Sequence, residues 1–318
     1  MAKLPAMLRP DEKRSHREEQ MHHIGKRDFL AGLGMAAAAT LASAQPLKKA
    51  PSPRGDNTLP NRMAKTTKLF KAPALYPNGM AVAPEGLWLA QQHLTEGEAK
   101  GAGAPMMTGK EALWLMDWDG KLIKTLHSDA SNTSGLAHGG GSLWAMANTT
   151  DASTGVHQVD LASGRQVAHR QIPLSPGNVS GGIHGAQWHD GKLWIVNNRM
   201  HSLIRIDTRT WTPEVQIPIF TPPGMERYHD ITFDKDGTIL QVIANNSTGE
   251  HDTKAGLVRY NAQTGAPIET ITFVEGACDP HGLELHNGML ISCNAGYHPG
   301  WKDRESASSG WVFSIELI

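Results

Sequence analysis

The stretch HGAQWHDGKLWIVNN, residues 184–198, decides the fold of this chain. A short strand-like run leads to Asp190-Gly191, and a second apolar run follows directly. Asp-Gly between two such runs is a strong hairpin signal, because glycine accepts the positive φ that a tight turn needs. The stretch therefore predicts a β-hairpin that begins at His184.

The same hairpin recurs along the chain at intervals of about 50 residues, which is typical of repeat architectures. The five repeats begin at one equivalent position, occupied by Asn78, Ser134, His184, His229 and His281. A second strand pair follows each hairpin, so that a full repeat has four strands. The last repeat has only one such strand, WVFSIELI at the C-terminal end, and TKLFKAPAL at residues 67–75 can supply the missing one.

Four strands per repeat predict an all-β fold, a β-propeller of four-stranded blades over residues 67–318. Closure of the ring by the N-terminal strand would hide sheet edges that are otherwise exposed. We count five blades, with six as the alternative. An open sandwich of short strands is the rival fold, but it would not explain the regular repeat. Residues 45–66, rich in Pro, Lys and Arg, are expected to form a flexible lead-in.

The N-terminal segment carries the features of an export signal. Residues 26–30, KRDFL, precede a short Ala- and Gly-rich apolar stretch, and Ala42-Ser43-Ala44 is a small-residue cleavage site. The pattern resembles a twin-arginine signal with Lys26 in place of the first arginine, and Sec export uses a similar layout. A membrane anchor is the alternative, although the stretch is too short to span a bilayer. We therefore expect residues 1–44 to be removed and the protein to be periplasmic or secreted.

Composition excludes several classes of protein. The 318 residues include 30 Lys and Arg against 31 Asp and Glu, a net charge of −1. A nucleic-acid binder needs a basic face, which this balance does not provide. Two cysteines exclude a disulfide framework and a four-cysteine zinc site. We expect a monomer, without a membrane span after signal removal, whose partner is a small molecule.

The repeats resemble those of the secreted propellers that include NHL-repeat proteins, streptogramin lyase and gluconolactonase-type lactonases. The likeness is carried by DGKLWIVNN at residues 190–198 and SLIRID at residues 202–207. It implies a propeller over residues 67–318. No family-specific site motif matches, so the resemblance assigns no catalytic residue, and fold alone does not settle function.

The first residues of the repeats are the most informative feature of the sequence. The start of an innermost strand lies near the axis of a propeller, so His184, His229 and His281 should converge there. Three neutral imidazoles can hold a divalent metal ion and leave a position open for water or substrate. Zinc and iron are the favoured ions, with calcium and magnesium as further candidates. The alternative is that these histidines only hydrogen-bond to neighbouring blades.

A layer of small polar side chains is expected at the same mouth, because the second strand of a hairpin finishes where the first begins. The predicted substrate-binding residues are Asn78, Ser134, Asn197, Asn245 and Asn294. Amides there can hydrogen-bond a polar substrate or orient metal-binding imidazoles. Ordinary turn chemistry at strand ends is an equally weighted alternative.

The loops that lead into the inner strands supply acid–base candidates. Glu226, Arg227 and Tyr228 directly precede His229, and Asp279 lies two residues before His281. Asp279 or Glu226 can serve as a general base, while Arg227 or Tyr228 can stabilise developing negative charge. A solvated position in a loop is the alternative for each carboxylate.

Two classes of function follow. The first is an exported metal-dependent hydrolase or lyase that acts on a small polar or cyclic substrate such as a lactone, with an iron-dependent oxygenase as a variant. The second is a non-catalytic propeller that binds a ligand or a partner protein.

Overall fold

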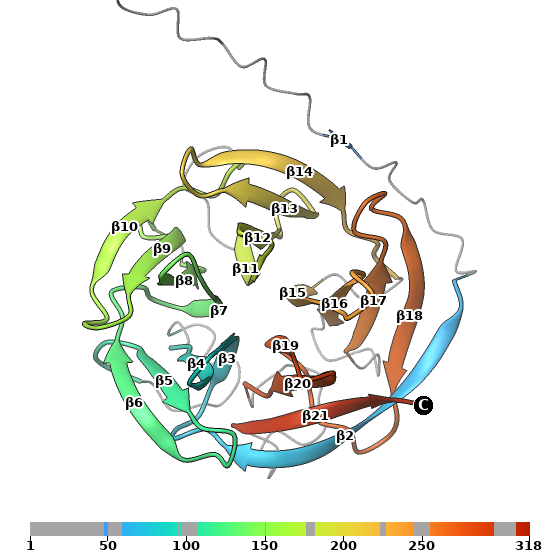
Figure 1. The fold of residues 1–318 in the computed structure, drawn as a ribbon, viewed down its shortest axis with the longest axis horizontal. Coiled ribbons are helices and arrows are strands. Elements are labelled where there is room, and N and C mark those ends of the chain that lie inside the picture. Colours follow the sequence, from blue (N-terminus) through green and yellow to red (C-terminus); the bar gives the residue numbers. More distant parts are fainter. Residues whose placement is uncertain are drawn as a thin grey trace, which may run out of the picture. The chain divides into compact units, whose positions relative to one another are not determined.

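The computed structural model describes residues 48–49, 59–93, 96, 107–149, 151–175, 182–222, 227–244, 255–295 and 310–318. All elements in this part of the chain are β-strands (Figure 1). No helix among these residues has the length and apolar character needed to cross a membrane. The expected export signal, residues 1–44, lies outside the described residues.

The strands form five groups of four, each antiparallel within itself. The first group is β3 (Pro77–Ala83), β4 (Gly86–Gln91), β5 (Ala112–Met116) and β6 (Leu122–His127). The second is β7 (Thr133–Gly139), β8 (Ser142–Ala147), β9 (Gly155–Asp160) and β10 (Gln166–Arg170). The third is β11 (Ile183–His189), β12 (Lys192–Asn197), β13 (Ser202–Asp207) and β14 (Thr212–Pro218), with the two-residue β1 (Lys48–Lys49) parallel to β14.

The fourth group is β15 (Arg227–Phe233), β16 (Ile239–Ala244), β17 (Gly256–Tyr260) and β18 (Pro267–Phe273). The fifth is β19 (Leu283–His286), β20 (Met289–Cys293), β21 (Trp311–Leu317) and β2 (Asn61–Lys71). The N-terminal strand thus completes the C-terminal group, as the sequence predicted.

Turn chemistry explains the hairpins. Asp190 and Gly191 both have positive φ, 49° and 72°, and Asn287 and Gly288 have φ of 49° and 78°. Two consecutive positive φ values are the mark of the two-residue turn whose twist matches that of the flanking strands. The dipeptides seen in the sequence therefore act as predicted.

The inner strands of the five groups lie side by side around a common centre. Each of β3, β7, β11 and β15 contacts the inner strand of the next group, and β19 contacts β3, which closes the circuit (Figure 1). Apolar side chains fill the space between neighbouring sheets; Ala81 of β3 and Leu136 of β7, for example, share one buried cluster. A closed circuit of four-stranded sheets is a propeller, so the open sandwich is excluded.

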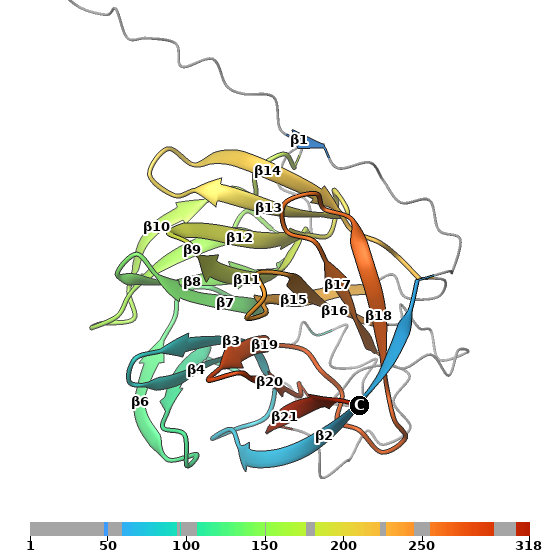
Figure 2. The same ribbon diagram turned by 45° about the vertical axis from the view of Figure 1, so that its right-hand side comes forward.

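The closing strand differs from its expected bounds. β2 spans Asn61–Lys71 rather than residues 67–75. Its second half pairs antiparallel with β21, while its first residues pair parallel with β18, from Asn61 opposite Thr270 to Ala64 opposite Phe273 (Figure 2). Residues 61–66 therefore belong to the sheet rather than to the lead-in, and this one strand joins the fourth and fifth groups.

Candidate functional site

The three histidines of the repeat position lie together at the inner strands. His184 is on β11, His229 on β15, and His281 just before β19, and all three are at most 6% exposed. The ring centres of His184 and His229 are 4.3 Å apart, and those of His229 and His281 are 4.7 Å apart. The structure thus gathers three imidazoles from consecutive sheets into one buried row.

Glycines beside the histidines allow this close approach. A Cβ placed on Gly135 would lie 2.2 Å from the backbone oxygen of His184, and one on Gly185 would lie 2.3 Å from Cα of Asp230. A Cβ on Gly79 would lie 2.5 Å from the carbonyl carbon of Gly135. Residues with a side chain cannot occupy these positions without moving backbone. The inner strands are therefore nearly in contact just behind the histidine row.

Two buried carboxylates tie the inner strands together, and sequence reasoning missed both roles. Asp230 accepts hydrogen bonds from the backbone N–H of Ala186 at 2.9 Å, Ile231 at 3.0 Å and Leu283 at 3.2 Å, so it joins β11, β15 and β19. In the sequence the signal is present, since Asp230 stands where the other repeats have glycine. Burial raises the pKa of Asp230 well above its usual range, and the charge of Glu284 acts in the same direction.

Glu284 is the second of these carboxylates. It accepts hydrogen bonds from the backbone N–H of Val82 on β3, at 3.2 Å, and from Nε2 of Gln187 on β11, at 3.0 Å. Burial raises its pKa to about 7, against the lowering effect of these bonds. Glu284 therefore connects the fifth group to the first and third.

Burial keeps His184 and His281 neutral. Burial, helped by the positive charge of Arg227, lowers the pKa of His281 to about 3, while a hydrogen bond with the backbone of Asp279 opposes the shift. Burial also lowers the pKa of His184 well below its usual value, helped by His281 and Arg227. Neutral imidazole is the form that binds metal ions.

Three imidazoles are a donor type that suits a divalent metal ion, but their geometry in this structure does not form a metal site. Nδ1 of His184 is buried and has no hydrogen-bond partner in the described part of the structure. Two imidazoles on one tetrahedral zinc ion at about 2.1 Å have ring centres about 5 Å apart, against 4.3 and 4.7 Å here. Within the described ranges, no three His, Cys, Asp or Glu side chains already have metal-ligand geometry. Metal binding would therefore require the imidazoles to turn.

Asp279 and Arg227 accompany the histidines. Oδ2 of Asp279 lies 3.7 Å from Nδ1 of His281, and Asp279 is 4% exposed. Burial raises its pKa well above the usual range, while Arg227, at the start of β15, lowers it. The structure thus brings one predicted carboxylate and one predicted cation to the histidine row.

Tyr228 is differently engaged. Its hydroxyl hydrogen-bonds with Nδ1 of His201 at 2.9 Å and with Oγ1 of Thr221 at 2.6 Å, and its ring belongs to a buried apolar cluster. These contacts assign it to packing in this structure. Two other predicted residues, Glu226 and Asn245, lie outside the described residues.

The remaining predicted polar residues fall into two kinds. The hydroxyl of Ser134 donates to backbone oxygens of Met146 and Ile183, and the amide of Asn197 is bonded to residues of neighbouring loops, as expected for turn chemistry. Asn78 and Asn294 are also buried, at 2% and 3% exposure, but each has an amide oxygen without a hydrogen-bond partner in the described structure. Among the predicted substrate-binding residues that the structure describes, Asn78 and Asn294 therefore have an amide oxygen available for a ligand; Oδ1 of Asn148 and of Asn198 is likewise without a partner in the described structure.

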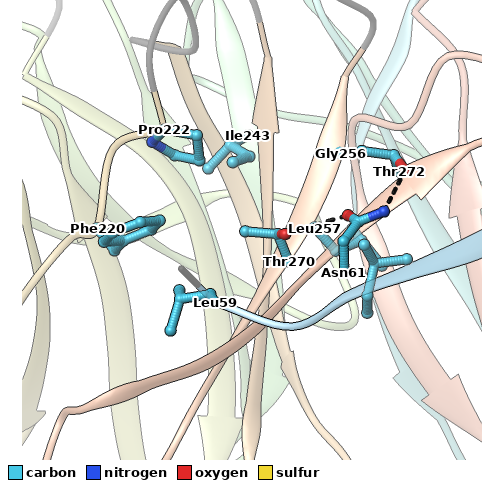
Figure 3. Close-up of a pocket in the computed structure, with 10 residues that line it drawn as sticks. Leu59, Asn61, Phe220, Pro222, Ile243, Gly256, Leu257, Thr270 and Thr272 are labelled. Carbon is cyan, nitrogen blue, oxygen red and sulfur yellow. Dashed lines mark hydrogen bonds between the residues drawn. The ribbon is translucent and has the colours of Figure 1, made fainter. Parts of the chain in front are cut away.

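A separate cavity of about 220 Å³ lies away from the histidines, beside β2 and β18 (Figure 3). Its walls are mainly apolar, including Leu59, Phe220 and Ile243. The amide of Asn61 is already bonded to the hydroxyls of Thr270 and Thr272. This cavity offers few free polar groups for chemistry.

Comparison with known proteins supports the fold. No family model matches the chain, and no curated protein does. The glutaminyl cyclase of Myxococcus xanthus has a similar structure, with a TM-score of 0.54 at 11% identity, covering 81% of this chain and 98% of that one. Streptogramin B lyase aligns with a TM-score of 0.37 at 12% identity, covering 80% and 98% of the two chains. At 11% identity the likeness to the glutaminyl cyclase extends to the fold alone, so function has to be argued from the site.

Proposed function

We propose that this protein is a metal-dependent hydrolase or lyase that acts on a small polar or cyclic, lactone-like substrate at the histidine row. The observation that carries the proposal is the burial of three imidazoles in one row, with Asp279 beside His281 and the charge of Arg227 acting on His184 and His281. A purely structural row of histidines would not require a buried nitrogen of His184 that lacks a hydrogen-bond partner within the described residues.

His184, His229 and His281 would hold the ion. Their nitrogen donors favour zinc or iron over calcium and magnesium, which prefer oxygen ligands. When bound, such an ion polarises a carbonyl group or lowers the pKa of water. An iron-dependent oxygenase remains the oxidative variant of the same site.

The chain's own groups have distinct parts in this proposal. Asp279 is the candidate base, because its carboxylate lies beside the imidazole of His281. Arg227 supplies a positive charge that favours an anionic oxygen in the transition state. Asn78 and Asn294 would hold polar groups of the substrate.

Three further features belong to the same proposal. Each four-stranded group counts as one blade, giving five. Residues 1–44 direct export, through the twin-arginine or the Sec route, to the periplasm or the medium. The mature protein acts as a monomer.

Elemental analysis of the mature protein, purified without chelators and again after loading with zinc, iron, calcium or magnesium, tests the proposal. We expect about one equivalent of metal, lost in His184→Ala and His281→Ala. Loss of a group that merely supports a ligand lowers metal affinity by about 10- to 100-fold, so loss of a ligand should exceed this. His286→Ala is the matched control, because His286 lies on β19 but stacks on Trp118, 3.6 Å away.

The outcome also separates the two classes of function. Metal that is retained by the control and lost by both site variants, together with turnover of a lactone panel by the loaded protein, supports the enzyme. A wild-type protein that takes up none of the four ions would overturn it and leave the non-catalytic binding scaffold as the better account.

A further inference from the structure

A chain of side-chain amides runs from the histidine site into the neighbouring sheet. Nδ2 of Asn78 donates to Oε1 of Gln92 at 2.5 Å, and Nε2 of Gln92 donates to Oδ1 of Asn132. Nδ2 of Asn132 then donates to the backbone oxygen of Asn148 at 2.9 Å. The three side chains are all at most 7% exposed, so water does not compete for these bonds.

The last bond fixes the direction of the whole chain. A backbone carbonyl only accepts hydrogen bonds, so Asn132 must present its NH₂ group to Asn148 and its oxygen to Gln92. Gln92 must therefore donate to Asn132 and accept from Asn78. It follows that Asn78 uses its NH₂ group inside the chain and presents its oxygen, Oδ1, elsewhere.

A buried carboxylate holds this arrangement in place. Glu111 accepts hydrogen bonds from the backbone N–H groups of His93 at 2.8 Å, Asn132 at 2.5 Å and Thr133 at 2.9 Å. These bonds position the backbone on both sides of the amide chain. Asn132 itself has a φ of 51°, which asparagine tolerates better than most residues.

The Asn78 end of the amide chain lies beside the histidine row, and its oxygen makes no hydrogen bond in the described structure. Oδ1 of Asn78 is buried and has no hydrogen-bond partner in the described part of the structure, and the same is true of Oδ1 of Asn294. The two residues are neighbours through Cys293, whose Sγ lies 3.3 Å from the backbone oxygen of Asn78. The backbone oxygen of Cys293 also accepts a bond from the N–H of His281 at 2.9 Å, which places this end beside the histidine row.

Leaving a buried acceptor unsatisfied costs about 1–3 kcal/mol, so a ligand that donates a hydrogen bond to Oδ1 of Asn78 or Asn294 would be favoured. We propose that Asn78, oriented by Gln92 and Asn132, and Asn294 form an acceptor subsite that binds a hydroxyl or amide N–H group of the substrate. The inference rests on the proposed function, since it takes the histidine row as the place where substrate binds. A carboxylate or phosphate oxygen is disfavoured there, because it would face two further acceptors. Asn78 and Asn294 would contact the ligand, and Gln92 is a positioning residue.

Binding of two nearly isosteric probes tests the polarity of the subsite. 2-Pyrrolidinone carries an N–H where γ-butyrolactone carries a ring oxygen. At that position the first probe is therefore a hydrogen-bond donor and the second is a hydrogen-bond acceptor. Ligand-observed NMR would measure both dissociation constants on the mature full-length chain, as purified and after chelator treatment. We expect the wild type to favour 2-pyrrolidinone by about tenfold or more in both states, the size expected for one unsatisfied buried acceptor.

Variants of Gln92 separate orientation from packing. Gln92→Met removes the acceptor that holds the NH₂ group of Asn78, so the amide can turn and γ-butyrolactone should gain affinity until the preference falls to about twofold. Gln92→Glu, which burial keeps protonated, retains an acceptor for Asn78 and offers its hydroxyl to Oδ1 of Asn132, so it should retain the wild-type preference. A merely structural role for Gln92 would weaken both probes equally and would not be rescued by glutamate.

Variants of Asn78 test the subsite without relying on Gln92. Asn78→Asp, which burial keeps protonated, can donate its hydroxyl to Oε1 of Gln92 and keep an oxygen acceptor toward the ligand, so it should keep the preference, whereas Asn78→Leu should abolish it. Equal affinity for the two probes, a preference for γ-butyrolactone, or binding of neither probe by the wild type would overturn the acceptor subsite. Metal content is measured separately, so a protein that binds no metal yet favours the donor probe would refute the proposed activity while leaving the subsite intact.

Discussion

Replacement of Gly135 by alanine tests whether contact between inner strands holds the histidine site together. The added Cβ would lie 2.2 Å from the backbone oxygen of His184, with Cα of Gly185 2.7 Å away. An ordinary contact of this kind is at least 3.4 Å, so one strand must move by about 1 Å, and the obstructing atoms are backbone rather than a flexible side chain. Overpacking of this severity costs about 3 kcal/mol or more.

The expected results are a fall of about 3 kcal/mol in the free energy of unfolding, measured by urea denaturation, and a fall of more than tenfold in zinc affinity as His184 shifts. Gly288→Ala is the matched control. Gly288 has a φ of 78° but open space around its Cβ position, so alanine there bears only the cost of a left-handed backbone, about 1–2 kcal/mol. Equal destabilisation by the two substitutions, with zinc affinity unchanged in Gly135→Ala, would refute the close-contact argument.

Three other predictions concern the fold. The pKa of Glu284 is raised from 4.5 to about 7 in the folded protein. Between these two pH values the folded protein keeps the proton on Glu284, whereas the unfolded chain has released it. The free energy of unfolding should therefore fall by about 3 kcal/mol between pH 4.5 and pH 7 through Glu284. Glu284→Gln should remove this part of the pH dependence, measured by urea denaturation at several pH values. The same pH dependence in the wild type and the variant would contradict the prediction. Arg259 is 7% exposed and pairs with two carboxylates at 2.7 and 2.8 Å, so Arg259→Leu should cost about 3–5 kcal/mol. Arg209→Ala should change stability far less, because its side chain is 87% exposed; similar thermal shifts in both variants would count against this. Deletion of residues up to 71 removes β2 and leaves the edges of β18 and β21 unpaired, so we expect aggregation on size-exclusion chromatography, and a monomeric, cooperatively unfolding product would show that closure is dispensable.

The architecture was predictable because its signals are local. Asp190-Gly191 and Asn287-Gly288 specify hairpins by themselves, and their recurrence reveals the repeat. The start of the closing strand was not predictable in the same way. Residues 61–66 are largely exposed, and their pairing with β18 joins segments some 200 positions apart, so no apolar alternation marks them as a strand.

The site was predictable where it follows the repeat and unpredictable where it depends on contacts between blades. Equivalent positions placed His184, His229 and His281 together in advance. The part played by Asp230 depends on N–H groups from three different four-stranded groups of the ring, which no single repeat contains. An aspartate in a position otherwise held by glycine was the one visible sign of it.

The orientation of the Asn78 amide is a second feature that the sequence alone could not predict. An asparagine side chain has both a donor and an acceptor, so its place in a repeat cannot say which one faces a ligand. In this protein the choice is made by the backbone oxygen of Asn148, acting through Asn132 and Gln92, and those residues come from two neighbouring sheets. A substitution that leaves Asn78 in place but reverses the chain would therefore change which ligands bind. In the proposed subsite, specificity belongs to the amide chain as a whole, because Asn78 does not set its own orientation.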